Sequence, residues 1–197
     1  MRTGVLHRLG LVVAWCAVSM LGSSHARAAV GDRWSWLEGT TWYVPESGLL
    51  AMASRPSLTT PVPVSDQTVY VIQGYKAGYF WGTTAVKYQK QGGTSAASPS
   101  CLQLVGSVTP NGQLHLTFTP KSSSGTKPAE ATTGTGAMVR PNGQWMMLNQ
   151  MATQPVADVL LSHWAYMKQC TKAGGPCENG LPGVGVSASS FLASCLK

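Results

Sequence analysis

The sequence predicts an all-β protein: a single antiparallel up-and-down β-barrel of about eight strands, followed by a short C-terminal helix. Apolar runs of strand length, rich in Val, Thr, Tyr and Trp, follow one another along the chain. The tetrapeptide Pro-Asn-Gly-Gln separates such runs twice, at residues 110–113 and 141–144. Proline presets the first corner of a turn and glycine adopts a left-handed backbone freely, so each copy predicts a β-hairpin. A two-sheet β-sandwich is the alternative fold.

The chain begins with a segment typical of a signal peptide. Arg2 and Arg8 stand at the two ends of a basic start, an apolar run follows, and residues 26–28 (Ala-Arg-Ala) form a small-residue cleavage site. The apolar run is shorter than the roughly 20 residues of a membrane-spanning helix. We therefore predict that residues 1–28 are removed and that residues 29–197 form one β-barrel domain. This domain is expected to be periplasmic or secreted, with no stable membrane span.

The charge distribution argues against one class of partner. The net charge of +7 falls to +4 when the three arginines of the first 28 residues leave with the signal peptide. The remaining Lys and Arg are scattered along the chain, whereas nucleic-acid-binding proteins gather them in a patch. We expect no nucleic-acid partner, and the sequence leaves the oligomeric state open.

The strands are predicted in chain order. They cover residues 40–45, 67–75, 79–89, 100–108, 114–120, 136–140 and 145–152. Leu114, Leu116 and Phe118 alternate with polar neighbours, which predicts one buried face. Residues 156–168 fit both a helix and a strand, and we favour an eighth strand because seven strands would leave a long edge exposed. Ser187 is the expected N-cap of the terminal helix.

Four cysteines remain after the signal peptide: Cys101, Cys170, Cys177 and Cys195. An even number of cysteines in an exported protein predicts two disulfides. Four cysteines allow three pairings, and the sequence does not choose among them. Cys170 and Cys177 lack the close spacing of a metal-ligand pair, so we expect no metal site.

The start of the first strand, Gly39-Thr40-Thr41-Trp42, resembles the start of lipocalins, where a glycine and a tryptophan open the first barrel strand. One residue separates the two in that family, and two separate them here. The resemblance implies a lipocalin-like or calycin-like β-barrel. The stretches "SDQTVYVIQGY", "GYFWG" and "HWAYM" also resemble an exported bacterial family, which implies no particular activity.

His163 and Asp66 are the candidates for acid–base chemistry. His163 lies on an apolar face, which predicts either a core histidine with a hydrogen-bond partner or a proton-transfer group. Asp66 and Glu46 stand in predicted loops beside strands, where each is either a turn residue or a general base. His115 lies on the polar face of its strand and is expected to contact solvent. The sequence contains no nucleophile elbow, phosphate loop or H-E-x-x-H motif, so we expect no cofactor.

Tryptophan and methionine residues in the strands predict either a filled barrel core or a cavity for an apolar ligand. Both are adaptable wall residues. The expected ligand-binding residues are Trp42, Trp81, Trp145, Met147 and Asn149.

We expect an exported protein that binds a small apolar molecule and is not an enzyme. One alternative is a barrel isomerase or cyclase that uses His163 or Asp66 as its base. Another is an envelope protein-interaction module, expected if the interior is filled and an apolar patch remains outside.

Overall fold

The computed structural model describes residues 32–46, 50–90, 98–121, 132–156, 159–170 and 175–197. The predicted signal peptide lies outside these ranges. Among the described residues, none of the helices has the length and apolar character needed to cross a bilayer. The elements are η1 (Asp32–Leu37), β1 (Thr41–Tyr43), β2 (Leu50–Ser54), β3 (Val62–Lys76), β4 (Tyr79–Lys90), β5 (Ser100–Val108), β6 (Gln113–Pro120), β7 (Thr132–Val139), η2 (Pro141–Gly143), β8 (Met146–Val156), β9 (Val159–Gln169), α2 (Pro176–Asn179) and α3 (Ala188–Leu192).

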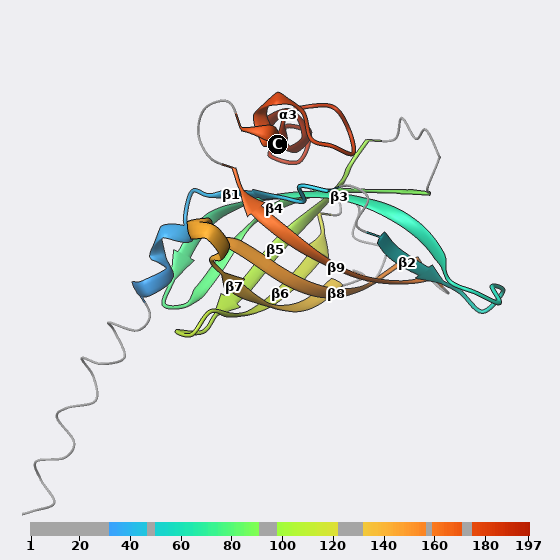
Figure 1. Cartoon of the computed structure of the whole chain (residues 1–197), viewed down its shortest axis with the longest axis horizontal. Coiled ribbons are helices and arrows are strands. Elements are labelled where there is room, and N and C mark those ends of the chain that lie inside the picture. The colour runs from blue at the N-terminus through green and yellow to red at the C-terminus, as the bar shows by residue number, and fades with distance from the viewer. Residues whose placement is uncertain (1–31, 47–49, 91–97, 122–131, 157–158, 171–174) are drawn as a thin grey trace, which may run out of the picture.

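The nine strands form one antiparallel sheet that closes into a barrel (Figure 1). From β3 to β9, each strand pairs with the next one along the chain. β1 and β2 complete the circle, because each of them pairs with β3 on one side and with β9 on the other. The two short strands therefore share one position, and the barrel has the eight positions that the sequence predicts. Closure of a single sheet excludes the β-sandwich.

Strand β2 was not predicted. Its residues, Leu-Ala-Met-Ala-Ser, contain no β-branched or aromatic side chain, and most of them favour a helix in isolation. Pairing with β3 and β9 overrides this preference. In the ambiguous region 156–168, residues 159–168 are a strand, because β9 pairs with β8, β1 and β2. Residues 157 and 158 lie outside the described residues.

The two predicted Pro-Asn-Gly turns are confirmed, and a third turn precedes them in the chain. Ala77 and Gly78 join β3 to β4 with φ values of 49° and 88°. Gly112, between β5 and β6, has a φ of 89°. Between β7 and β8, Asn142 and Gly143 have φ values of 51° and 78°. Each hairpin thus places glycine in the left-handed region, where a side chain would be strained.

The barrel interior is filled with large side chains. Its most deeply buried members are Trp42, Tyr70, Phe80, Ile72, Leu104, Leu116, Met147 and Met167. They belong to one apolar cluster with Phe118, Met138 and Met151. The tryptophan and methionine content predicted either a filled core or a ligand cavity. This part of the interior is a packed core.

The C-terminal segment packs against the outside of the barrel (Figure 1). Leu181, Phe191 and Leu192 form a second apolar cluster with Val69 of β3 and Ala85 of β4. The predicted N-cap of α3 is confirmed, since the Ser187 hydroxyl accepts a hydrogen bond from the backbone N–H of Ser190 at 3.1 Å. This segment is a strap that covers the apolar outer face of β3 and β4.

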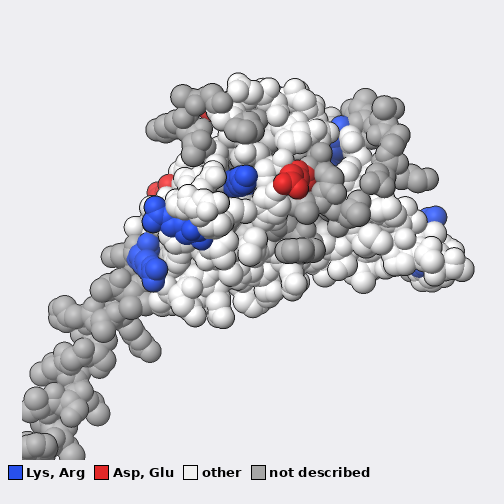
Figure 2. All heavy atoms as spheres, in the orientation of Figure 1, with Lys and Arg blue, Asp and Glu red and all other residues white. Residues whose placement is uncertain are grey.

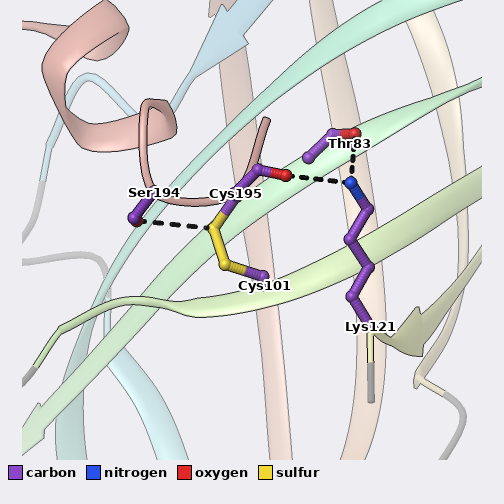
Figure 3. Close-up of a disulfide and its surroundings, with 5 residues drawn as sticks. All are labelled: Thr83, Cys101, Lys121, Ser194 and Cys195. Carbon is purple, nitrogen blue, oxygen red and sulfur yellow. Dashed lines mark hydrogen bonds between the residues drawn. A yellow bond between two sulfur atoms is a disulfide. The ribbon is translucent and has the colours of Figure 1, made fainter. Parts of the chain in front are cut away.

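Two disulfides fasten the C-terminal part of the chain. Cys101 of β5 is bonded to Cys195, and Cys170 is bonded to Cys177. Beside the first disulfide, the Lys121 ammonium donates hydrogen bonds to the Thr83 hydroxyl at 3.1 Å and to the Cys195 carbonyl at 2.9 Å (Figure 3). The predicted number of disulfides is confirmed, and the structure selects one of the three possible pairings.

Candidate functional site

The two ends of the barrel differ in chemistry, and tryptophans close one of them. Trp34 and Trp36 of η1 pack against Trp145 with ring centroids 5.2 and 5.6 Å apart, and Trp36 lies 6.3 Å from Trp42. Trp34 Nε1 donates to the Thr109 carbonyl at 2.9 Å, which anchors η1 to the β5–β6 turn. We call this end the Trp end.

Arginines extend the aromatic packing at the Trp end. The Arg33 guanidinium lies 5.3 Å from the ring centroid of Trp34, and the Arg140 guanidinium lies 5.4 Å from that of Trp145. Elsewhere on the face seen in Figure 2, charged side chains are few among uncharged ones. The two arginines cover the packed tryptophans, so the Trp end of the barrel is closed.

The five predicted ligand-binding residues do not surround one cavity. Trp42 and Trp145 belong to the Trp end, and Met147 and Asn149 are buried on β8. Trp81 lies on the outer face, where its side chain is 43% exposed. Its ring covers Gly74, because a Cβ built there would lie 2.2 Å from Trp81 Cζ2.

The opposite end of the barrel holds a group of buried and partly buried polar side chains. We call it the polar cluster, and its members are Asp66, Thr68, Thr84, Tyr88, Thr132 and His163. They come from β3, β4, β7 and β9, between the middle of these strands and the ends that lie away from η1. The sequence placed Asp66 in a loop, and this was wrong, because β3 begins four residues earlier at Val62. The two predicted acid–base candidates therefore meet inside the barrel.

Asp66 and His163 form the centre of the polar cluster. Asp66 Oδ2 and His163 Nδ1 are 3.2 Å apart, and the two side chains are 3% and 2% exposed. The distance is that of an ion pair, although the angles fall outside those of an aligned hydrogen bond. The other carboxylate oxygen, Oδ1, accepts a hydrogen bond from the Thr68 hydroxyl at 2.7 Å. The carboxylate is thus held between a threonine and an imidazole.

A small cavity lies beside this pair. Its volume is about 10 Å³, and its lining comprises Thr68, Thr84, Val86, Tyr88, Leu102, Phe118, Thr132, Met151 and His163. Thr84 Oγ1 and His163 Nε2 are buried without a hydrogen-bond partner in the protein. Tyr88 and Leu102 are partly exposed, so the cavity lies next to the surface.

Burial changes the acidity of two tyrosines in the interior. Burial raises the pKa of Tyr88, the charge of Asp66 raises it further, and the nearby Thr153 hydroxyl opposes the rise. Burial also raises the pKa of Tyr70, and the Asn149 side chain opposes it. Both phenols therefore remain protonated at neutral pH and act as hydrogen-bond donors.

The other acid–base candidates lie outside the polar cluster. The Tyr166 hydroxyl donates a hydrogen bond to Glu46, and burial together with this carboxylate raises the pKa of Tyr166 to about 12. His115 is exposed on the outer face of β6, as expected. Within the described ranges, no three His, Cys, Asp or Glu side chains come close enough to hold a metal ion.

Two open grooves follow the outer face of β6, β7 and β8, and the larger one extends to β2 and β9, where Met52, Ser162 and His163 line it. Their volumes are about 660 and 510 Å³, and both are lined by His115, Thr135 and Gln150, which are exposed. Exposed groups exchange hydrogen bonds with water, so these grooves discriminate less between ligands than a buried polar cluster does. The polar cluster is therefore the better candidate for a functional site.

Four members of the polar cluster were not anticipated: Thr68, Thr84, Tyr88 and Thr132. The sequence carried a signal for one of them. Thr68 alternates with the buried Tyr70 and Ile72 along β3, and a period of two places all three on one face. Tyr88 lies opposite Asp66 in the β3–β4 register, which only the pairing reveals.

The comparisons with known proteins define no family. No family model matches the chain, and no curated protein matches it. Among solved structures, it matches a chain from work on the de novo design of transmembrane β-barrels, with a TM-score of 0.39 and 9% identity, over 68% of this chain and 97% of that one. A likeness of this size says nothing about activity. The eight-position barrel agrees with a calycin-like architecture, and a relation to lipocalins stays a prediction.

Proposed function

We propose that this chain is an exported β-barrel that binds a small molecule at the end of its interior that carries the polar cluster. One observation carries the proposal: Thr84 Oγ1 and His163 Nε2 are buried beside a cavity and have no partner in the protein. Buried polar groups almost always have hydrogen-bond partners. A water or a ligand in the cavity supplies the missing ones.

The lining of the cavity indicates the kind of ligand. Val86, Leu102, Phe118 and Met151 provide apolar contacts, and the polar cluster provides hydroxyl and imidazole groups. A ligand that suits both has a small apolar body and one or two hydrogen-bonding groups. The cavity has about the volume of one water, roughly 10–15 Å³, so a ligand displaces that water and moves the partly exposed Leu102.

Binding can be tested by NMR on the oxidised protein. Small cyclic ketones, phenols and alcohols are titrated while the methyl signals of Thr84, Thr132 and Met151 are followed. We expect saturable shifts confined to this end of the barrel, and weaker binding by Thr84→Val, which keeps the shape but removes the hydroxyl. Binding that is unaffected by Thr84→Val, or shifts that map only to the outer face, would contradict the proposal.

A second candidate function is a protein-interaction module. Trp81 and Val105 are paired neighbours on the outer face of β4 and β5, and Tyr79 lies two residues before Trp81 on the same face. All three are exposed, and exposed apolar side chains that gather in this way are typical of interfaces. Failure of every interior titration, together with loss of a partner by Trp81→Ser, would favour this function.

A further inference from the structure

We infer that His163 is a general base and acid that moves a proton within the bound molecule, with Asp66 and Thr68 as positioning residues. This makes the site that of an isomerase acting on a small carbonyl compound. The inference rests on the proposed function, because proton transfer requires a molecule bound beside His163.

The position of Asp66 favours one tautomer of the imidazole. Its Oδ2 faces His163 Nδ1 at 3.2 Å, while Thr68 holds Oδ1 at 2.7 Å. A carboxylate on Nδ1 favours the tautomer that carries its proton there, and this leaves a lone pair on Nε2. Hydrogen bonds of this kind are commonly long or misaligned in an empty site and tighten when the substrate binds.

The other nitrogen of His163 is the one available to a ligand. Nε2 is buried and has no partner in the protein, and the ring lines the cavity. The ring is held edge-on by Tyr88, with centroids 5.9 Å apart and an interplanar angle of 86°. A base that is fixed, unpaired and shielded from water is suited to remove a proton from a bound molecule.

Two hydroxyl groups that line the cavity can donate hydrogen bonds to the oxygen of a carbonyl compound. Thr84 Oγ1 is buried in the same cavity without a partner, and the Tyr88 phenol stays protonated because burial and Asp66 raise its pKa. Hydroxyl donors stabilise the negative charge that develops on a carbonyl oxygen when a neighbouring C–H bond breaks. The pairing of a base with such donors selects a ketone or aldehyde with an acidic C–H.

The proposed step balances without any co-reactant. His163 Nε2 takes the proton from the carbon beside the carbonyl, and the electron pair of the broken C–H bond forms the C=C bond of an enol or enolate. The imidazolium that results is stabilised by the Asp66 carboxylate. The imidazolium N–H exchanges its hydrogen with solvent through the cavity, which lies next to the surface. The same nitrogen then returns a proton to the same carbon, which now carries a hydrogen from solvent, or to a different carbon, which moves the double bond.

Exchange of hydrogen for deuterium tests this step without knowledge of the natural substrate. Cyclopentanone, cyclohexanone and 2-cyclohexenone are incubated with the oxidised full chain in D₂O, and loss of the α-proton signal is followed by ¹H NMR. We expect exchange above the buffer rate, and a fall of about 100-fold or more in His163→Gln, in line with the usual contribution of a general base. The matched control is His115→Gln, which changes the exposed histidine of β6 and is expected to exchange at the unmodified rate.

The role of Asp66 is tested by the exchange rate and by the position of the His163 proton, because a purely structural residue would not control the latter. In Asp66→Asn the exchange rate should fall while probe binding persists, and ¹⁵N NMR should show that His163 no longer carries its proton on Nδ1. ¹⁵N NMR of the unmodified protein tests the position of the His163 proton directly, and this measurement does not require a variant to fold. A neutral His163 with its proton on Nε2 overturns the inference.

The outcomes separate the inference from the proposed function. Interior binding of the ketones without exchange overturns proton transfer and leaves the binding function intact. If the ketones show no binding and no exchange, both the inference and the proposed function are overturned. Exchange that persists in a folded His163→Gln, or that is lost in His115→Gln, overturns the assignment of His163.

Discussion

At the scale of single residues, glycines set how closely the strands approach inside the barrel. A Cβ built on Gly82 would lie 1.8 Å from the carbonyl oxygen of Val71. At Gly106 a Cβ would meet the Phe80 ring at 2.3 Å. A backbone oxygen held in a sheet cannot move aside, whereas a side chain can, so the two glycines are not equivalent.

Gly82→Ala is therefore expected to lower the free energy of unfolding by about 3 kcal/mol, at the upper end of the usual cost of overpacking. Gly134→Ala is the matched control, because its Cβ would lie 2.7 Å from Met151 Cγ, in a flexible side chain, and 3.0 Å from the carbonyl oxygen of Gln150, a much longer backbone contact than the one at Gly82. We expect about 1 kcal/mol there. Chemical unfolding of both variants measures the difference, and equal losses would contradict this account of close packing.

Tyr70 makes the protein sensitive to alkali. Burial raises its pKa above the ordinary 10.0, and its hydroxyl donates to Met147 Sδ at 2.7 Å. The unfolded chain loses this proton near pH 10, while the folded protein keeps it. Stability is therefore intact below pH 10 and falls as the pH rises above it.

Between pH 10 and 11, Tyr70 is expected to contribute a loss of about 1 kcal/mol. Tyr70→Phe should make the decline in stability shallower over this interval, whereas Tyr79→Phe on the outer face should leave it unchanged. Urea unfolding at pH 8, 10 and 11 gives the slopes. An identical slope in Tyr70→Phe and the unmodified protein would show that the buried phenol is not responsible.

At the scale of elements, η1 stabilises the barrel from one end. It is about two turns of 3-10 helix, too short to be stable alone, and its stability comes from Trp34 and Trp36 packing on Trp145. Trp34→Ala removes a buried ring and its hydrogen bond to Thr109, so we expect a loss of about 3–5 kcal/mol.

The matched control for η1 is Trp81→Ala, which removes the same side chain from the outer face. Trp81 is 43% exposed, so its removal should cost about 1–2 kcal/mol. Thermal unfolding compares the two variants. A smaller effect at Trp34 than at Trp81 would mean that the Trp end does not depend on η1.

At the scale of the whole molecule, the disulfides join the strap to the barrel. Cys101 and Cys195 are 94 residues apart, and Cys170 and Cys177 are 7 apart. In the chain-entropy model the longer loop contributes about 4–5 kcal/mol and the shorter one about 2–3 kcal/mol. The strap covers apolar side chains of β3 and β4, so its release exposes them.

The double variant Cys101→Ser with Cys195→Ser is expected to lower the melting temperature more than Cys170→Ser with Cys177→Ser. Hydrogen exchange should rise first in α3, while the β5–β6 and β7–β8 hairpins stay protected. Thiol titration of the processed protein, residues 29–197, should find no free thiol before reduction. Four reactive thiols at that stage would contradict the disulfides.

Much of the fold could be predicted because it depends on neighbours in the chain. The Pro-Asn-Gly turns, the alternation on β6 and the N-cap at Ser187 are local patterns, and each of them recurs in the structure. His163 was singled out because it interrupts an apolar face, and the structure buries it. Local periodicity reports which side chains share a face, and it does so without knowledge of the partner strands.

Tertiary pairing decided the rest. Residues 50–54 became a strand only because β3 and β9 flank them, and the cysteine pairing depended on where the C-terminal strap lies. Asp66 and His163 are nearly a hundred positions apart, and closure of the barrel brings them within 3.2 Å. Contacts of this kind arise from the register and curvature of the whole sheet, and no local pattern encodes them.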